Sequence, residues 1–274
     1  MKILWVFAHP EQRSLNASLM ADGLRVLAGE GHDTRVSDLY AMGWNPVLDA
    51  PDVRRTPSDR RLYLGDEQER AWDAGELGAD IRAEQDKLRW ADGVVLHFPL
   101  WWHGPPAVLK GWFDRVFTKG FAFGVKDAEG RARRYGDGGL AGKRSLIVTS
   151  VGAREASFGP GGIHGHIDDI LFPLQHGTFW YTGMAPLEPF VVYGADRLTD
   201  TEYAHRAHEL GQRLRGLPEE RPVPYRTERG GDYDDDLVLK PHLARRGAGP
   251  SLHLAGEGCS VRERAERPLV EQEG

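Results

Sequence analysis

Two short apolar runs, each ending at a proline, constrain the fold of this chain more than any other feature. Ile3–Ala8 is unbroken until His9-Pro10, and Val94–Pro99 ends in the same way. Such runs are typical of strands buried on both faces of a parallel sheet. After the first run and a polar turn, one helical stripe is formed by Leu15, Leu19, Leu24 and Leu27. Strand, short loop and helix make the first half of a βαβ unit.

Strands and helices continue to alternate as far as residue 217. The predicted strands are Ile3–Ala8, Thr34–Leu39, Val94–Pro99, Ser145–Ser150 and Pro189–Tyr193. Further helices are predicted over Asp80–Ala91 and Thr199–Leu214, whereas Met42–Gly78 is expected to be an extended surface loop. This alternation predicts an α/β fold with a doubly wound, five-stranded parallel sheet and helices on both faces.

The chain divides into two parts by composition. Residues 1–217 are expected to form one catalytic domain, and residues 218–274 a C-terminal extension rich in Pro, Gly and Asp. The start of the extension is expected to be an ordered but irregular wrap. From Gly247 onward, the low apolar content favours disorder.

Charge and cysteine content exclude several classes of function. A net charge of −6 gives no basic field for nucleic acid, which is an unlikely partner. The single cysteine, Cys259, cannot form an intrachain disulfide or a cysteine-based metal site, and we interpret it as an incidental thiol. No metal site is predicted. Because no apolar run has the length of a membrane span or a signal sequence, we expect a cytoplasmic protein.

Three loops follow the predicted strands and should converge, because ligands of such sheets bind at the carboxyl ends of the strands. They are His9–Leu15, Pro99–Gly104 and Thr149–Gly161. The first opens a helix, whose N-terminal N–H groups favour a phosphate-bearing ligand. Ser14 or Asn16 could add a donor there or could simply cap the helix. This segment contains neither a GxGxxG motif nor a Walker P-loop, so binding of a nucleotide through either motif is disfavoured.

The segment Phe98–Phe117 carries the densest pattern. Trp101 and Trp102 stand together in a loop, where large aromatic rings are costly to expose unless a flat ligand or a subunit covers them. Pro105-Pro106 then predicts the first turn of a helix with aromatic residues at helical spacing. Those helical rings are better explained by core or dimer packing, whereas ligand contact is the better interpretation for the two tryptophans.

Four segments of the chain together resemble the NAD(P)H:quinone oxidoreductase family, and the bacterial branch in particular. They are His9-Pro10, Ser37–Met42, Phe98–Phe117 and Gly162–Gly165, and the resemblance covers most of residues 1–217. It implies a flavodoxin-like fold that binds a flavin without a covalent bond. The flavin implied is FAD, with FMN as the alternative. The resemblance also implies a homodimer with the active site at the subunit interface.

The resemblance assigns roles to residues of this chain. Cofactor contacts are implied for His9, Leu15, Asn16, Leu100, Trp101, Trp102, His103, Thr149, Ser150, Val151, Gly152 and Phe158. Ala122, Phe123 and Gly124 are implied to shape the substrate pocket. His164 corresponds to the active-site histidine, which can donate a hydrogen bond or proton as negative charge develops on the reduced flavin. A purely structural histidine in a glycine-rich turn is the alternative.

Two residues depart from the family pattern. Phe158 stands where the family has a tyrosine that partners the histidine, and Val125 stands near a second pocket tyrosine. Neither side chain has a hydroxyl for proton transfer. Proton handling and the choice of acceptor are therefore the properties most open to change.

The resulting hypothesis is a ping-pong reaction, in which NAD(P)H delivers hydride to the flavin and leaves before a quinone or similar small acceptor takes two electrons. NADH and NADPH are not distinguished. Two alternatives remain open. One is an azo, nitro or secondary-metabolite reductase on the same scaffold, and the other is an electron-carrier or accessory flavoprotein with incidental turnover.

Overall fold

The structure is a computed structural model that describes residues 1–54, 61–244 and 249–255. A parallel sheet lies at its centre, in the strand order β2-β1-β3-β4, with β5 and β6 both paired to the outer edge of β4. The strands are β1 (Lys2–Phe7), β2 (Asp33–Asp38), β3 (Gly93–Pro99), β4 (Arg144–Val151), β5 (Ala185–Pro186) and β6 (Phe190–Tyr193). This confirms the predicted doubly wound α/β fold.

The fifth position of the sheet is shared by two short segments instead of one strand. β5 pairs with the start of β4, and β6 pairs with its end from Val148 to Val151. Pro186 and Pro189 have no N–H group to donate to the ladder, which accounts for the interruption between the two segments. The predicted strand Pro189–Tyr193 corresponds to the second of them.

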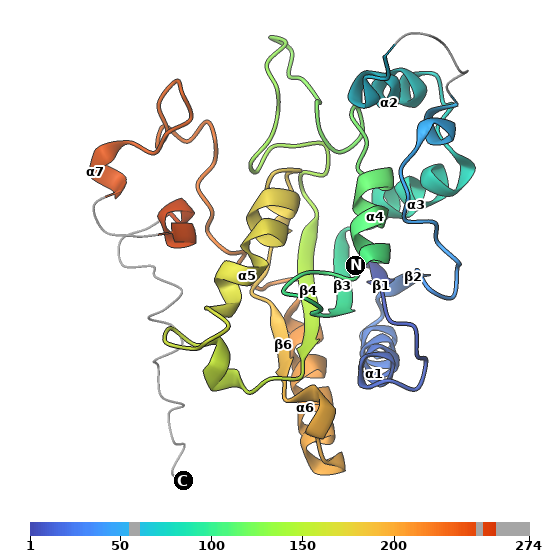
Figure 1. Cartoon of the computed structure of the whole chain (residues 1–274), viewed down its shortest axis with the longest axis vertical. Coiled ribbons are helices and arrows are strands. Elements are labelled where there is room, and N and C mark those ends of the chain that lie inside the picture. The colour runs from blue at the N-terminus through green and yellow to red at the C-terminus, as the bar shows by residue number, and fades with distance from the viewer. Residues whose placement is uncertain (55–60, 245–248, 256–274) are drawn as a thin grey trace.

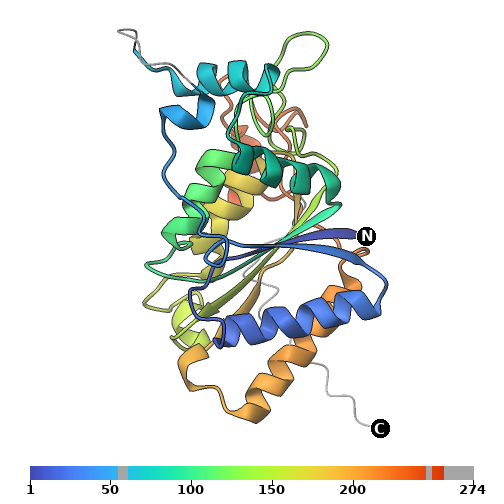
Figure 2. The same cartoon turned by 90° about the vertical axis from the view of Figure 1, so that its right-hand side faces the viewer.

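Helices cover both faces of the sheet, as Figures 1 and 2 show. α1 (Leu15–Gly29) and α6 (Asp200–Gly216) lie side by side on one face. The other face carries α3 (Ala79–Trp90), α4 (Ala107–Val116) and α5 (Ile167–Leu174). β1 contributes side chains to the cores on both faces, because alternate residues of a strand point to opposite faces of the sheet. Trp5 packs toward α1 and α6, and Leu4 packs toward α3 and α4.

Residues 42–78 are not the extended loop that their composition predicted. They contain a short 3₁₀ turn, Ala50–Val53, and the helix α2 (Leu64–Asp73). The buried face of α2 offers Gln68 and Ala71 rather than large apolar side chains, so the segment is too polar overall to be recognised as a buried helix. Three further elements were not predicted from the sequence. They are α5, the π-helical turn Gln175–Trp180 that continues it, and the short helix α7 (Pro241–Ala244).

A buried ion pair fastens the 3₁₀ turn to α4. Arg115 donates from Nε and Nη2 to the two carboxylate oxygens of Asp52, at 2.9 and 2.6 Å. Its Nη1 lies 2.7 Å from the carboxylate of Asp80, at the start of α3. The side chains of Arg115 and Asp52 are only 4% and 8% exposed. One guanidinium therefore joins three segments, through a buried pair with Asp52 and a pair with the half-exposed Asp80.

Gly111 allows α4 to pack against the chain before the 3₁₀ turn. A Cβ at this position would lie 2.2 Å from the carbonyl oxygen of Pro46 and 2.4 Å from its Cα. We expect Gly111→Ala to lower the free energy of unfolding by about 1–3 kcal/mol, although alanine favours helix. Urea unfolding should reveal the loss. Gly216→Ala is the matched control, because a Cβ there meets nothing within 4 Å; equal effects at the two sites would contradict the packing argument.

The described part of the extension runs beside α5 (Figure 1) and is anchored there. Trp180 donates its indole N–H to the carbonyl oxygen of Arg226 at 2.9 Å, and the ring of Tyr225 lies 6.2 Å from that of Phe172 in α5. Residues 249–253 form a 3₁₀ turn, although disorder was expected from residue 247. The remainder of that expectation, and Cys259 with it, lies outside the described residues.

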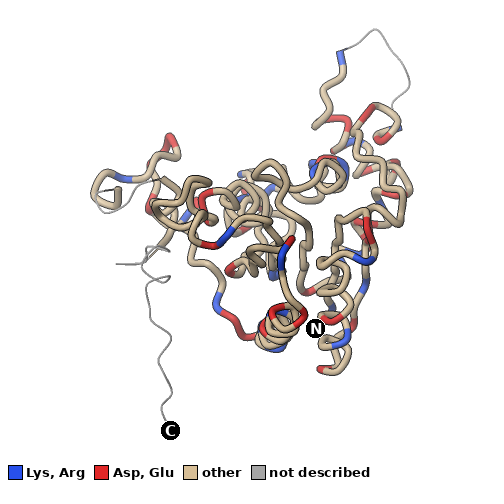
Figure 3. The backbone as a smooth tube through the Cα atoms, turned by 60° about the horizontal axis from the view of Figure 1, so that its bottom comes forward, with Lys and Arg blue, Asp and Glu red and all other residues tan. Residues whose placement is uncertain are grey.

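Charged residues of both signs are mixed along the chain. Basic and acidic residues are interspersed along the backbone in the coloured part of Figure 3. Among the described residues, no helix has the length and apolar character needed to cross a membrane.

Candidate active site

The carboxyl ends of β1, β3, β4 and β6 lie at one edge of the sheet. The chain places β2 on one side of β1 and then β3 and the later strands on the other side, so the strand order reverses between β1 and β3. The three loops predicted to converge do so at this edge. The rings of His9 and Trp101, from the first two loops, lie 6.2 Å apart. Ser150 joins the second and third loops by accepting a hydrogen bond from the backbone N–H of Leu100 at 2.9 Å. This switch point is where ligands bind in open α/β sheets.

The first turn of α1 offers donors at this edge. Ser14 is the N-cap, and its hydroxyl accepts from the N–H of Ala17 at 3.2 Å. The backbone N–H groups of Leu15 and Asn16 have no acceptor within the described residues, as is usual for a helix N-terminus. They lie next to the loop of His9. The positive end of α1 can therefore receive a phosphate.

The side chain of Asn16 is buried and connects α1 to β3 and β4. Its side chain is 4% exposed, donates to Ser150 Oγ at 3.0 Å, and places Oδ1 3.1 Å from His97 Nε2. Burial, with a smaller contribution from His9, lowers the pKa of His97 to about 3. His97 is thus neutral in the folded protein at neutral pH. The side chain of Asn16 holds α1 against β3 and β4, and its backbone remains available to a ligand.

The lowered pKa of His97 predicts acid sensitivity. The unfolded chain binds a proton at His97 below a pKa of 6.5, while the folded chain does not until about pH 3. Stability should therefore fall as the pH drops below 6.5, by about 1.4 kcal/mol per pH unit from this group. Urea unfolding at pH 7, 6 and 5 should give a shallower decline for His97→Gln than for wild type. Parallel declines would contradict this assignment, and the exposed His205→Gln should match wild type.

Trp101 to Gly104 form a tight turn that displays the two tryptophans. The backbone N–H and C=O groups of Trp101 and Gly104 exchange two hydrogen bonds of 3.0 Å, and Trp102 and His103 have φ of +51° and +58°. Asn and Gly usually occupy such positions, and a bulky residue there costs on the order of 1–3 kcal/mol. The indole of Trp101 is 43% exposed and that of Trp102 completely exposed. A strained turn that presents aromatic surface is typical of a binding site.

His103, Phe158 and His164 form an aromatic cluster beside this turn. The imidazole of His164 stacks on the buried ring of Phe158, with centroids 4.7 Å apart, and meets His103 edge to face at 5.6 Å. The backbone N–H of His164 donates to Ser157 at 3.1 Å. The imidazole nitrogens of His164 form no hydrogen bond within the described residues. The ring is therefore held in position by stacking, with its donors free for a ligand.

Tyr193 is a residue of this cluster that the sequence reasoning missed. Its ring lies 5.8 Å from that of Phe158, at the end of β6. Burial, with the carboxylates of Glu155 and Asp168, raises the pKa of its hydroxyl. The end of the fifth predicted strand could have identified it, because that position lies at the ligand-binding edge. The hydroxyl that Phe158 lacks is present on a neighbouring ring.

An apolar groove of about 620 Å³ begins at the Trp101–Gly104 turn. His103, Phe113, Phe117, Phe123 and Tyr181 contribute to its walls. Among the three predicted pocket residues, Phe123 lines this groove and Ala122 is fully buried. Gly124 has a φ of +70° and packs against Lys119. A flat apolar molecule fits such walls.

The remaining predicted cofactor residues lie at the end of β4 and after β3. The hydroxyl of Thr149 donates to the carbonyl oxygen of Phe98 at 2.8 Å, and Val151 is buried. The carbonyl oxygen of Gly152 accepts from Arg197 Nη2 at 2.9 Å. Leu100 is half-buried behind the turn. Side chains of this segment are used inside the protein, so its contribution to a ligand would come from backbone groups.

Comparison with known proteins gives consistent results. A family model described as "Flavodoxin-like fold" matches residues 1–214. "Ribosyldihydronicotinamide dehydrogenase-like protein traD" of Penicillium crustosum is 41% identical over 261 residues, covering 94% of this chain and 97% of that protein. "NAD(P)H dehydrogenase [quinone] 1" of Rattus norvegicus is 34% identical over 223 residues, covering 81% and 79%. The crystal structure of a "Putative quinone reductase" from Klebsiella pneumoniae has a TM-score of 0.89 and 42% identity, covering 93% and 100%.

Proposed function

Because this chain belongs to the flavodoxin-like family, together with the quinone dehydrogenases that it resembles, we propose that it is a flavin-dependent oxidoreductase. Its substrates are a dihydronicotinamide, which gives a hydride, and a quinone or similar small electrophile, which receives two electrons. NADH and NADPH are the expected donors. The names of the relatives add ribosyldihydronicotinamide to the donors that need testing.

The observation that carries this proposal is the juxtaposition of aromatic surface and free phosphate donors at the switch point. The exposed rings of Trp101 and Trp102 suit a flat ring system, while the N–H groups of Leu15 and Asn16 suit a phosphate. FAD has both parts and is the proposed cofactor. When bound, the flavin supplies the hydride acceptor and the two-electron store.

The chain's own residues then have distinct tasks. His164 donates a hydrogen bond or proton to the charge that develops on reduction, from a ring fixed by Phe158. The apolar groove from His103 to Phe123 orients a planar acceptor and excludes water. Because one groove opens at the turn, donor and acceptor use it in succession, which gives ping-pong kinetics.

The proposal includes a homodimer in the reducing cytoplasm. Trp102 is completely exposed and Ile163, beside His164, is 91% exposed. Two large apolar side chains next to a candidate active site are best covered by a second copy of the chain. That copy would close the groove and complete the acceptor pocket.

Anaerobic stopped-flow of the purified protein tests the proposal. NADH or NADPH should bleach the flavin absorbance in one phase, and menadione should restore it in a second phase that does not depend on the donor. Absence of flavin, or no bleaching by any dihydronicotinamide, would refute the proposal. Bleaching without rapid reoxidation by quinones would favour an azo, nitro or other acceptor, or an accessory flavoprotein. Mass spectrometry of the released cofactor distinguishes FAD from FMN.

A further inference from the structure

A second cavity lies between the extension and the π-helical turn, lined by residues other than those of the candidate active site. Its volume is about 140 Å³. The wall on the side of the main domain is formed by Tyr135 and His176, and the extension adds Arg226, Tyr233 and His253. Nothing in the proposed reaction uses these residues.

The cavity has aromatic walls. His176 lies face to face with Phe172, with centroids 4.7 Å apart and planes 9° apart, and 5.1 Å from the ring of Tyr135. His253 lies 5.0 Å from His176, and Tyr233 stacks on His253 with its hydroxyl 2.9 Å from His253 Nδ1. A continuous wall of flat rings favours a flat ring packed against it.

His176 is a buried polar group whose hydrogen-bonding capacity is unused. The residue is 9% exposed and lines the cavity. Four aromatic rings surround it, and neither imidazole nitrogen has a hydrogen-bond partner within the described residues. These nitrogens are not sealed from solvent, so a hydroxyl group of a ligand can take the place of water there.

The charged groups of the walls are already paired, which decides the charge of a ligand. Arg226 lies 2.5 Å from Asp232, and Glu228 lies 2.5 Å from Arg134. Burial lowers the pKa of His176 to about 4 and also lowers that of His253, so both imidazoles are neutral at neutral pH. The cavity therefore offers no unpaired charge and suits a neutral molecule.

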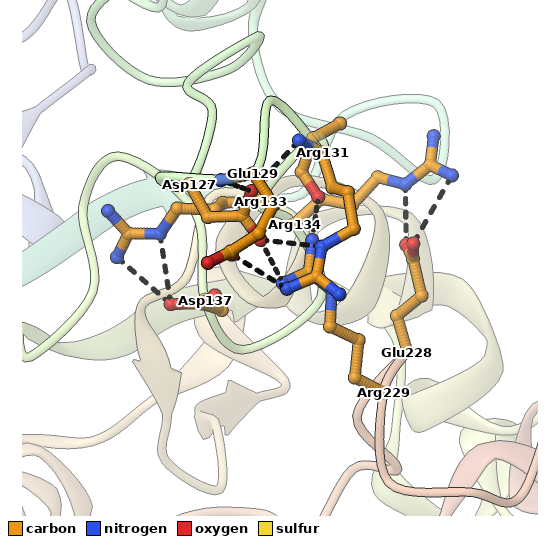
Figure 4. A network of polar contacts seen from close by, with 9 residues as sticks. Asp127, Glu129, Arg131, Arg133, Arg134, Asp137, Glu228 and Arg229 are labelled. Atoms are coloured by element: carbon orange, nitrogen blue, oxygen red, sulfur yellow. Dashed lines mark hydrogen bonds and ion pairs between the residues drawn. The ribbon is translucent and has the colours of Figure 1, made fainter.

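Ion pairs hold the cavity wall in place (Figure 4). Arg229 of the extension donates to Asp127 at 2.7 Å and to the carbonyl oxygen of Ala132 at 2.8 Å. Together with the pair of Arg134 and Glu228, these contacts fix residues 127–135 against the extension. The cavity is thus bounded by segments that are tied to each other and does not depend on one loop.

We propose that this cavity binds a small neutral phenol, whose ring packs against the aromatic wall and whose hydroxyl pairs with an imidazole nitrogen of His176. The size agrees, because an engineered cavity of about 150 Å³ holds one benzene molecule. A neutral imidazole has one donor and one acceptor nitrogen, and a phenol hydroxyl can satisfy either.

Ligand-observed fluorine NMR with 4-fluorophenol tests this on the purified holoprotein. Wild type should bind saturably, and His176→Phe, which keeps a flat ring beside Phe172 but removes both nitrogens, should bind at least 10-fold more weakly. Fluorobenzene has no hydroxyl, so it should not distinguish the two proteins. Leu237→Trp is a second variant at the half-exposed rim of the cavity, and it should weaken binding by obstruction.

The candidate active site also has aromatic walls, so His164→Phe serves as the site control. This variant should bind 4-fluorophenol like wild type if the second cavity is the site. Loss of binding in His164→Phe but not in His176→Phe would overturn the proposal, as would the absence of saturable binding to wild type. Crystals soaked with 4-bromophenol should give anomalous density in the cavity, beside His176 and Tyr233. A side chain of a second copy in that position would also overturn it.

Discussion

Replacement of His164 by Gln is expected to lower the rate of acceptor reduction by about 100-fold, the lower end of what a positioned proton donor contributes. The cofactor content should not change, because the phosphate donors and the two tryptophans lie on other loops. The stacked geometry on Phe158 shows how the ring is held, and its free nitrogens are the groups that the substitution alters. Stopped-flow with reduced enzyme and menadione measures the rate directly.

The matched control for His164→Gln is His205→Gln, on the exposed side of α6. It should leave both half-reactions at the wild-type rate. A purely structural role of His164 predicts a different result, namely a lower thermal midpoint or loss of flavin with little change in rate per bound flavin. Tyr193→Phe would then identify whether the neighbouring hydroxyl contributes, since it removes one oxygen from the same cluster.

The largest effect on stability is expected from Arg115→Met. Methionine keeps much of the volume but leaves the buried carboxylate of Asp52 without its partner. Removing one member of a buried ion pair typically costs 3–5 kcal/mol, roughly a third to a half of the stability of an ordinary domain. Urea unfolding followed by tryptophan fluorescence should show this loss.

Lys110→Met is the control for Arg115→Met, because Lys110 pairs with Asp114 on the same helix, with side chains 63% and 43% exposed. An exposed pair contributes about 0–1 kcal/mol. Similar losses for the two variants would mean that the buried pair is not the cause. The double variant Arg115→Met with Asp52→Leu should recover part of the loss, since no unpaired charge remains in the interior.

The centre of the sheet could be predicted because β1, β3 and β4 are buried on both faces. Ile3–Ala8 is apolar throughout, and Val94–Pro99 is apolar except for His97, which contacts Asn16. α2 escaped prediction because its buried face is made of Gln68 and Ala71. Its position depends on contacts with other segments, such as Trp72 on Phe121, which no local pattern records.

The sequence indicated which loops form the candidate site, but it did not indicate the direction of each side chain. Asn16 and Thr149 face inward and make hydrogen bonds within the protein. Tyr193 joins the cluster through the pairing of β6 with β4, which is a long-range contact. Sequence spacing fixes which strand ends meet, whereas the direction of each side chain depends on packing across the sheet.

The turn of Trp101 to Gly104 also has a kinetic consequence. Its two hydrogen bonds fix the backbone before any ligand arrives, so association requires little ordering of this segment. Capture of a flat molecule on these rings should therefore be governed by diffusion and orientation. Differences in affinity among variants of the turn should be found in the lifetime of the complex, with association rates nearly constant.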